Sequence, residues 1–192
     1  MFKTVGAIAV ASCVLLLAGC GPKAPTPTVN DSMTKVMAPH TQTIWDITSN
    51  AFNAKGDGLD PSKISSADWA RLEAAGRALR DRALVLAEAK HVTAAAPGEH
   101  IMGQEAAGAA SKIGHEWDAA NATRVQAMID ANPALFAERA RVLADAGDTI
   151  VKAVPTRNVS KLYEVSSGMD EVCDGCHQKF WGTDEPPPFP RK

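Results

Sequence analysis

The chain has 192 residues, of which 45% are hydrophobic and 22% are charged, proportions typical of a folded globular protein and unlike those of collagenous, disordered or multi-span membrane proteins. Its formal net charge is -2, and acidic and basic residues are distributed along the whole sequence, so the sequence offers no basic patch for a nucleic-acid backbone. We therefore expect a single folded domain that does not bind nucleic acid.

The first twenty residues have the layout of a secretory signal peptide. Lys3 precedes an apolar run over residues 5–18 that is too short to span a bilayer comfortably, and small residues end this run before Cys20. The segment Leu17-Ala18-Gly19-Cys20 resembles the lipobox of bacterial lipoproteins, in which the cysteine becomes the acylated N-terminus. The resemblance implies that Cys20 anchors the mature protein to a membrane through its acyl chains.

Two alternatives to lipidation are a discarded signal peptide, in which Cys13 and Cys20 are merely small apolar residues, and an uncleaved anchor over residues 1–20. Gly21 stands where an Asp would resemble an inner-membrane retention signal. We therefore expect a periplasmic protein attached to the outer membrane of a Gram-negative bacterium. Residues 21–31 contain three prolines and are predicted to form a semi-extended linker.

From residue 32 to residue 182 the apolar residues recur at every third or fourth position, which predicts an all-α domain. The first helix is expected from Met33 to Ala51, with Pro39 starting a turn or kinking it. A second helix follows the cap at residues 65–66 and runs toward Val92.

The second half of the domain continues this pattern as far as a Pro-rich tail at residues 183–192. Residues 104–131 are Ala- and Gly-rich and are expected to be partly helical. A helix is predicted from Ala134 to Val154, and a last one from the cap Asn158 through Phe180. Short connections between these helices indicate an antiparallel four-helix bundle.

The chemistry of the chain is concentrated in Cys173-Asp174-Gly175-Cys176-His177. Two thiols three residues apart lie on one face of a helix, where they can form thioethers to the two vinyl groups of a haem. His177 follows Cys173 by one helical turn, so its imidazole lies beside the same face, in position to bind the iron. The motif predicts one covalent haem c, attached through Cys173 and Cys176 with His177 as an axial ligand.

Three other uses of the cysteine pair fit the surrounding sequence less well. A structural zinc site needs four ligands, and no second Cys-x-x-Cys or histidine cluster follows Cys20. A thioredoxin-like dithiol is expected in a βαβ setting, and a disulfide between positions three apart in a helix is geometrically awkward. The sequence therefore favours haem attachment.

The place of this motif resembles that in the cytochrome c′ family, the class II c-type cytochromes, where it lies in the last helix of a four-helix bundle. Here it is preceded by Asn-Val-Ser-Lys-Leu at residues 158–162 and followed by Gln-Lys-Phe-Trp at residues 178–181. The resemblance implies the bundle fold, thioethers at Cys173 and Cys176, His177 as the proximal ligand, and a possible homodimer. Trp181 is a departure, because gas-binding members of the family often have an arginine there.

The resemblance further implies that the residue facing the distal side of the haem comes from the first helix. An apolar residue there leaves the iron five-coordinate and open to small gases, whereas a ligand makes the haem low-spin and suited to electron transfer. The family register places His40 at this position, with Met37 one turn away on the same stripe. We expect His40 to be the sixth ligand and Met37 to be the second candidate. The alternative is an open or water-filled distal site.

These features predict a membrane-tethered cytochrome that transfers electrons by Fe(III)/Fe(II) cycling and docks transiently with another redox protein, without being an enzyme. The alternative is a five-coordinate cytochrome c′ that binds NO or CO. A haem peroxidase would need a positioned distal acid or base, and only His40 could serve. His91, His100 and His115 lie in polar, Ala-rich segments and are expected at the surface.

Overall fold

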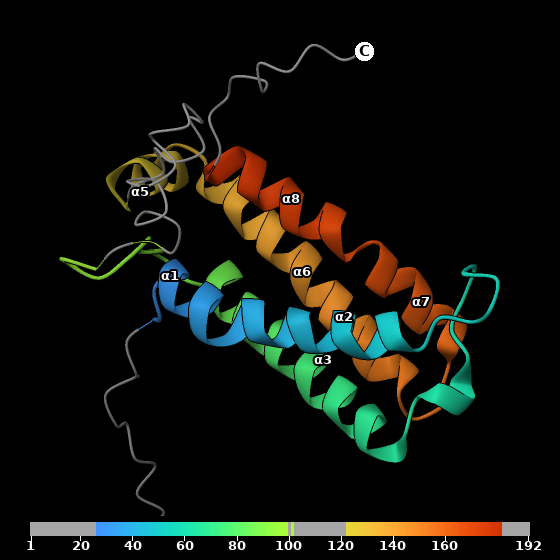
Figure 1. Ribbon diagram of the computed structural model, residues 1–192. Helices are drawn as coiled ribbons and strands as arrows, with labels where there is room; N and C mark the ends of the chain where they lie inside the picture. Colours follow the sequence, from blue (N-terminus) through green and yellow to red (C-terminus); the bar gives the residue numbers. More distant parts are fainter. Residues whose placement is uncertain (1–25, 100, 102–121, 182–192) are drawn as a thin grey trace, which may run out of the picture.

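The computed structural model describes residues 26–99, 101 and 122–181 (Figure 1). Within these ranges the regular structure is helical, and the one β-type pairing is an isolated bridge between Phe52 and Leu59, which confirms the predicted all-α class. None of the helices in this part of the chain is long and apolar enough to cross a membrane. Cys20, His100 and His115 lie outside the described residues, as do residues 183–192 of the predicted tail.

The first helix runs without a break through α1 (Val29–Ser32), a π-helical segment (Met33–Met37) and α2 (Ala38–Asn50). It begins inside the segment assigned to the linker on sequence. Thr28 caps it, because its hydroxyl accepts a hydrogen bond from the backbone N–H of Asp31 at 3.0 Å, which satisfies one of the unpaired donors of the first turn.

Pro39 neither ends this helix nor begins a turn; the irregularity is the π-helical segment just before it. Proline lacks the N–H that would bond to the carbonyl of Lys35, and its ring crowds that carbonyl. The backbone N–H of Ala38 reaches back to the carbonyl of Met33, one residue further than in an α-helix. The wider π-helical turn lets the helix pass through the proline, and such turns often occur at functional sites.

A 3-10 turn (Pro61–Lys63) leads into α3 (Ser66–Ala87). Ser65 and Asp68 form a reciprocal capping box, in which the Ser65 hydroxyl accepts from the N–H of Asp68 at 3.1 Å. The Ser65 hydroxyl also holds the pKa of Asp68 below its ordinary value. The predicted cap is therefore confirmed.

The end of α3 at Ala87 comes before the predicted end at Val92, and this is a correction to the sequence-based boundary. The segment beginning at Val92 makes other hydrogen bonds. The carbonyls of this segment accept hydrogen bonds from the backbone N–H groups of Val29 and Asn30, each at 2.9 Å. The side-chain amide of Gln126 also bonds to the backbone of this segment, accepting from one N–H and donating to one carbonyl. These distant partners replace the helical pattern.

The described chain resumes with α5 (Ala122–Ala131), which is followed by α6 (Pro133–Ala153). Helix α6 packs antiparallel along α3, and the two backbones are closest where Gly76 faces Gly147. A Cβ atom at Gly147 would lie 2.6 Å from the carbonyl oxygen of Gly76 and 2.8 Å from the backbone nitrogen of Arg80. Glycine at both positions is what permits this crossing.

The C-terminal helical region consists of two helices, α7 (Val159–Ser167) and α8 (Met169–Phe180), rather than the single helix predicted. The predicted cap is confirmed, since the Asn158 side chain accepts from the N–H of Lys161 at 2.9 Å. Gly168 separates the two helices; glycine is a poor helix former, which favours an interruption at this point.

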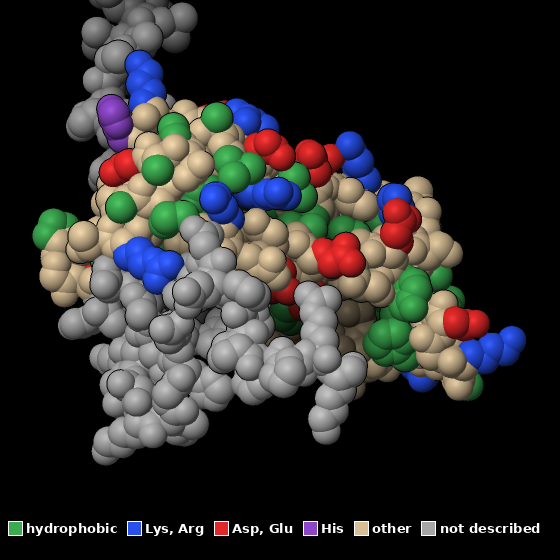
Figure 2. Space-filling view, turned by 90° about the horizontal axis from the view of Figure 1, so that it is seen from above, with side chains coloured by type: hydrophobic (Ala, Val, Ile, Leu, Met, Phe, Trp, Pro, Cys, Tyr) green, Lys and Arg blue, Asp and Glu red, His purple; other side chains and the backbone are tan. Residues whose placement is uncertain are grey.

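The described helices bury a continuous core (Figure 1). The first helix packs on α3, and its C-terminal half also contacts α7, whereas α8 packs on α6 and α5. Phe52 and Tyr163 meet edge to face at 6.0 Å between the loop after α2 and α7. On the face shown in Figure 2, acidic and basic side chains are interspersed among apolar ones.

Candidate haem-attachment site

The two cysteines of the motif lie on the inward stripe of α8. Met169 and Phe180 on the same stripe are buried, with 0% and 4% of their surface exposed, while Cys173 and Cys176 are half-buried and pack against the core. Phe180 also meets Phe136 of α6 edge to face at 5.3 Å, which fixes α8 on α6. The thiols are held at the border between the core and the surface.

No disulfide joins Cys173 to Cys176. Burial raises the pKa of the Cys176 thiol to about 11, with Cys173 acting in the same direction and Arg139 opposing the shift. Burial also raises the pKa of Cys173, and nearby acidic side chains add to the shift. Both sulfurs are therefore neutral thiols near pH 7.

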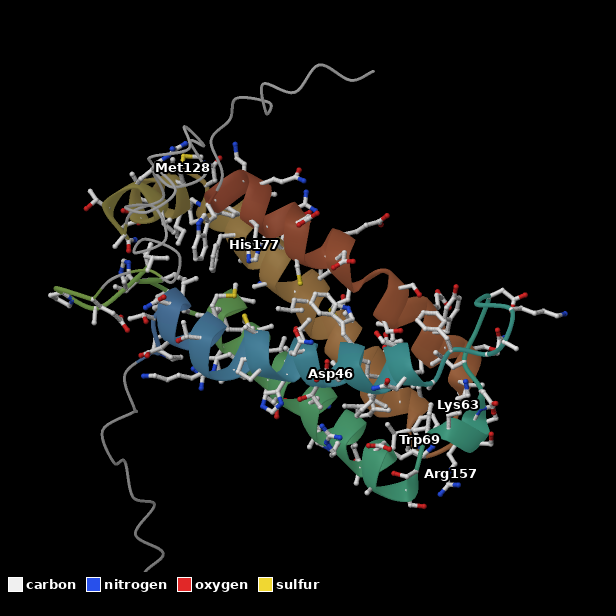
Figure 3. All side chains as sticks on the ribbon, in the orientation of Figure 1. Asp46, Lys63, Trp69, Met128, Arg157 and His177 are labelled. Carbon is white, nitrogen blue, oxygen red and sulfur yellow. The ribbon has the colours of Figure 1, made fainter. Side chains whose placement is uncertain are left out.

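His177 lies one residue beyond Cys176 and so flanks the cysteine stripe. Figure 3 shows it between α8 and the first helix in that view. The Trp181 ring, one turn further along, lies 5.8 Å from the imidazole between centroids, with the planes tilted by 54°. Trp181 thus packs on the predicted proximal ligand. It stands at the position where gas-binding members of the cytochrome c′ family often have an arginine.

The surroundings of His177 favour the neutral imidazole. The residue is exposed as a whole, yet neighbouring atoms desolvate the ring enough to lower the pKa of His177, while Asp174 opposes this effect. A neutral imidazole is the form of histidine that binds a metal. The protonation state at neutral pH is therefore the one that an axial iron ligand requires.

Arg139 of α6 is a neighbour of the motif that was not predicted from the sequence. A Cβ atom at Gly175 would lie 3.5 Å from Nη1 of Arg139, so the guanidinium packs against the backbone between the two cysteines. Nε of Arg139 is buried and has no hydrogen-bond partner among the described residues. Only the packing of α6 on α8 reveals this contact, because the two segments are far apart in the sequence.

The two distal candidates lie in or just after the π-helical segment of the first helix. Met37 is buried, with 4% of its surface exposed, and His40 is half-buried. Within the described ranges the His40 side chain makes no hydrogen bond. His91, by contrast, is exposed as predicted.

Comparisons with protein-family models, curated proteins and solved structures find no match to this chain. Among the described residues, no group of three or more His, Cys, Asp or Glu side chains is arranged to hold a metal ion. A haem iron does not need such a group, because the porphyrin supplies four of its ligands and the protein one or two.

Proposed function

We propose that this protein is a c-type cytochrome of the cytochrome c′ type, a four-helix bundle formed by the first helix, α3, α6 and the α7–α8 region. The observation that carries the proposal is the state of the motif in α8. Two unpaired, half-buried thiols and a neutral imidazole lie within one helical turn on one side of a helix. These residues fit the requirements of covalent haem attachment.

In this proposal Cys173 and Cys176 hold the haem through thioethers, and His177 binds the iron on the proximal side. When bound, the haem supplies one-electron Fe(III)/Fe(II) chemistry. Trp181 packs on the His177 ring and restrains its rotation, which keeps the ligand oriented. The core around Met169 and Phe180 keeps α8 rigid on α6, so the site need not reorganise when an electron arrives.

We further propose that the first helix supplies the sixth ligand and that this ligand is His40, with Met37 the second candidate. His40 is partly accessible and has no competing hydrogen bond among the described residues, whereas Met37 is packed in the core. Two nitrogen ligands make the iron low-spin and lower its reduction potential relative to a His/Met pair, because a thioether favours ferrous iron. Electron transfer then needs no open coordination position.

Optical spectra of the oxidised and reduced protein test this assignment. We expect the wild-type protein to be low-spin in both states and to bind CO poorly. His40→Ala should convert the spectrum to high-spin and open the iron to CO, whereas Met37→Ala should leave it low-spin. His91→Ala is the control, because this exposed histidine lies outside the proposed site.

Two other results would correct the proposal in defined ways. Conversion to high-spin by Met37→Ala, but not by His40→Ala, would make Met37 the ligand. A wild-type protein that is high-spin when reduced and binds CO readily would replace electron transfer with gas binding. Rapid turnover with peroxide would indicate a haem enzyme instead.

We also propose that acylated Cys20 tethers this cytochrome in the periplasm, where it exchanges electrons with another redox protein. The supporting pattern is the apolar run that ends in Leu17-Ala18-Gly19-Cys20. Two or more acyl chains give stable membrane attachment. We therefore expect Cys20→Ser to move the protein from the membrane fraction to the soluble fraction, and equal partitioning of wild type and variant would exclude the anchor.

A further inference from the structure

Arg139 is half-buried, and the described structure supplies no hydrogen-bond partner for its buried Nε. Its Nε is enclosed without a hydrogen-bond acceptor, and no ion pair joins it to an acidic side chain in the described ranges. An unsatisfied buried donor costs stability, and a guanidinium cannot escape the cost by losing its proton. A group kept at such a cost needs an explanation.

The surroundings of Arg139 connect it with the cysteine stripe of α8. The guanidinium lies against Gly175, with Nη1 3.5 Å from where a Cβ would be. Because Gly175 immediately precedes Cys176, this places the positive charge beside the second predicted attachment point. Gly175 and His177 lie on opposite flanks of Cys176 at 100° per residue, so Arg139 is on the side of the stripe away from the imidazole.

We propose that the fixed positive charge of Arg139, which lies beside Cys176, raises the reduction potential of the haem attached to α8. This inference rests on the proposed haem attachment. A cation in a partly desolvated site disfavours the additional positive charge of ferric iron, so it favours the ferrous state. The effect requires no direct contact between Arg139 and the iron.

Asp174 provides the opposite charge within the same motif. It stands three residues before His177 on α8, but it is exposed, so water and salt screen its charge more strongly. The proposal therefore predicts two shifts of opposite sign and unequal size. Removing the Asp174 charge should raise the potential slightly, and removing the Arg139 charge should lower it more.

The test is a redox titration of the full-length haem-loaded protein, followed optically. We expect Arg139→Met to shift the Fe(III)/Fe(II) equilibrium about tenfold toward ferric, which lowers the midpoint by about 59 mV for a one-electron couple. Arg139→Lys should stay near the wild-type value, and Asp174→Asn should shift slightly upward. Arg141→Met is the matched control, because this arginine is exposed on the same helix.

Stability is measured on the same variants, because a purely structural role would change unfolding and leave the potential unchanged. We expect Arg139→Met to unfold at the wild-type temperature or above, since it removes an unsatisfied donor. If Arg139→Met does not fold, Arg139→Gln takes its place, and the same fall in midpoint potential is expected. A midpoint equal to that of wild type in the charge-removing variant overturns the role of Arg139 alone, whereas a wild-type protein without covalent haem overturns the proposed function as well.

Discussion

Replacing both Cys173 and Cys176 with alanine is expected to abolish covalent haem attachment in protein exported to a compartment with a c-type maturation system. Each thiol supplies one thioether in the proposed site, so the double variant keeps only the bond from His177 to iron, which does not survive denaturation. We expect a denaturing gel stained for haem to show a signal at the mass of the wild-type chain and none for the double variant.

The single variants and a substitution between the cysteines act as controls for this result. Cys173→Ala and Cys176→Ala should each keep one thioether and a reduced haem stain. Gly175→Ala should keep the full stain, because its Cβ would meet the Arg139 guanidinium at 3.5 Å, an ordinary van der Waals contact. Haem staining that persists in the double variant, or is missing from the wild type, contradicts the proposed site.

The features that were predicted correctly from the sequence are those with a local cause. The apolar period of three and four residues predicts helices, and the all-α class is confirmed. The caps at Ser65 and Asn158 are confirmed because a cap depends on side chains within three residues of one another. The grouping of Cys173, Cys176 and His177 on α8 follows in the same way from helical geometry.

The features that were missed depend on contacts between distant segments or on small energy differences. Helix α3 ends early because its continuation bonds to the first helix and to Gln126, and neither partner is visible from the residues near Val92. The break at Gly168 leaves the buried face intact, since Leu162, Ser166 and Met169 are all buried across it. One glycine inside a helix costs only about 1 kcal/mol. Tertiary contacts therefore decide whether the helix breaks there.

The contact of Arg139 with the motif also could not be predicted from the sequence, because it joins distant segments of the chain. Its position in the sequence, in the middle of a helix with charged residues on its outer face, is typical of an exposed arginine. Its place beside Gly175 depends on how α6 and α8 are rotated against each other. Motif reasoning selects the residues proposed to attach a haem, whereas a neighbouring charge such as that of Arg139 becomes visible only from the packing.

The crossing of α3 and α6 is expected to be the most sensitive point of the fold. In Gly147→Ala the new Cβ would lie 2.6 Å from the carbonyl oxygen of Gly76 and 2.8 Å from the backbone nitrogen of Arg80. Backbone atoms cannot swing aside as a side chain does, so the two helices must move apart. We expect a cost of about 3 kcal/mol from overpacking, reduced by about 1 kcal/mol of gained helix propensity.

The net loss of about 2 kcal/mol corresponds to a fall in Tm of about 4–8 °C for a domain of this size, measurable by circular dichroism. Gly76→Ala should behave alike, because its Cβ would lie 2.8 Å from the carbonyl oxygen of Gly147. Gly168→Ala is the matched control, since its nearest contact of 3.5 Å is ordinary, and it should change stability by less than about 1 kcal/mol. Equal stability of Gly147→Ala and Gly168→Ala would mean that the helices do not cross this closely.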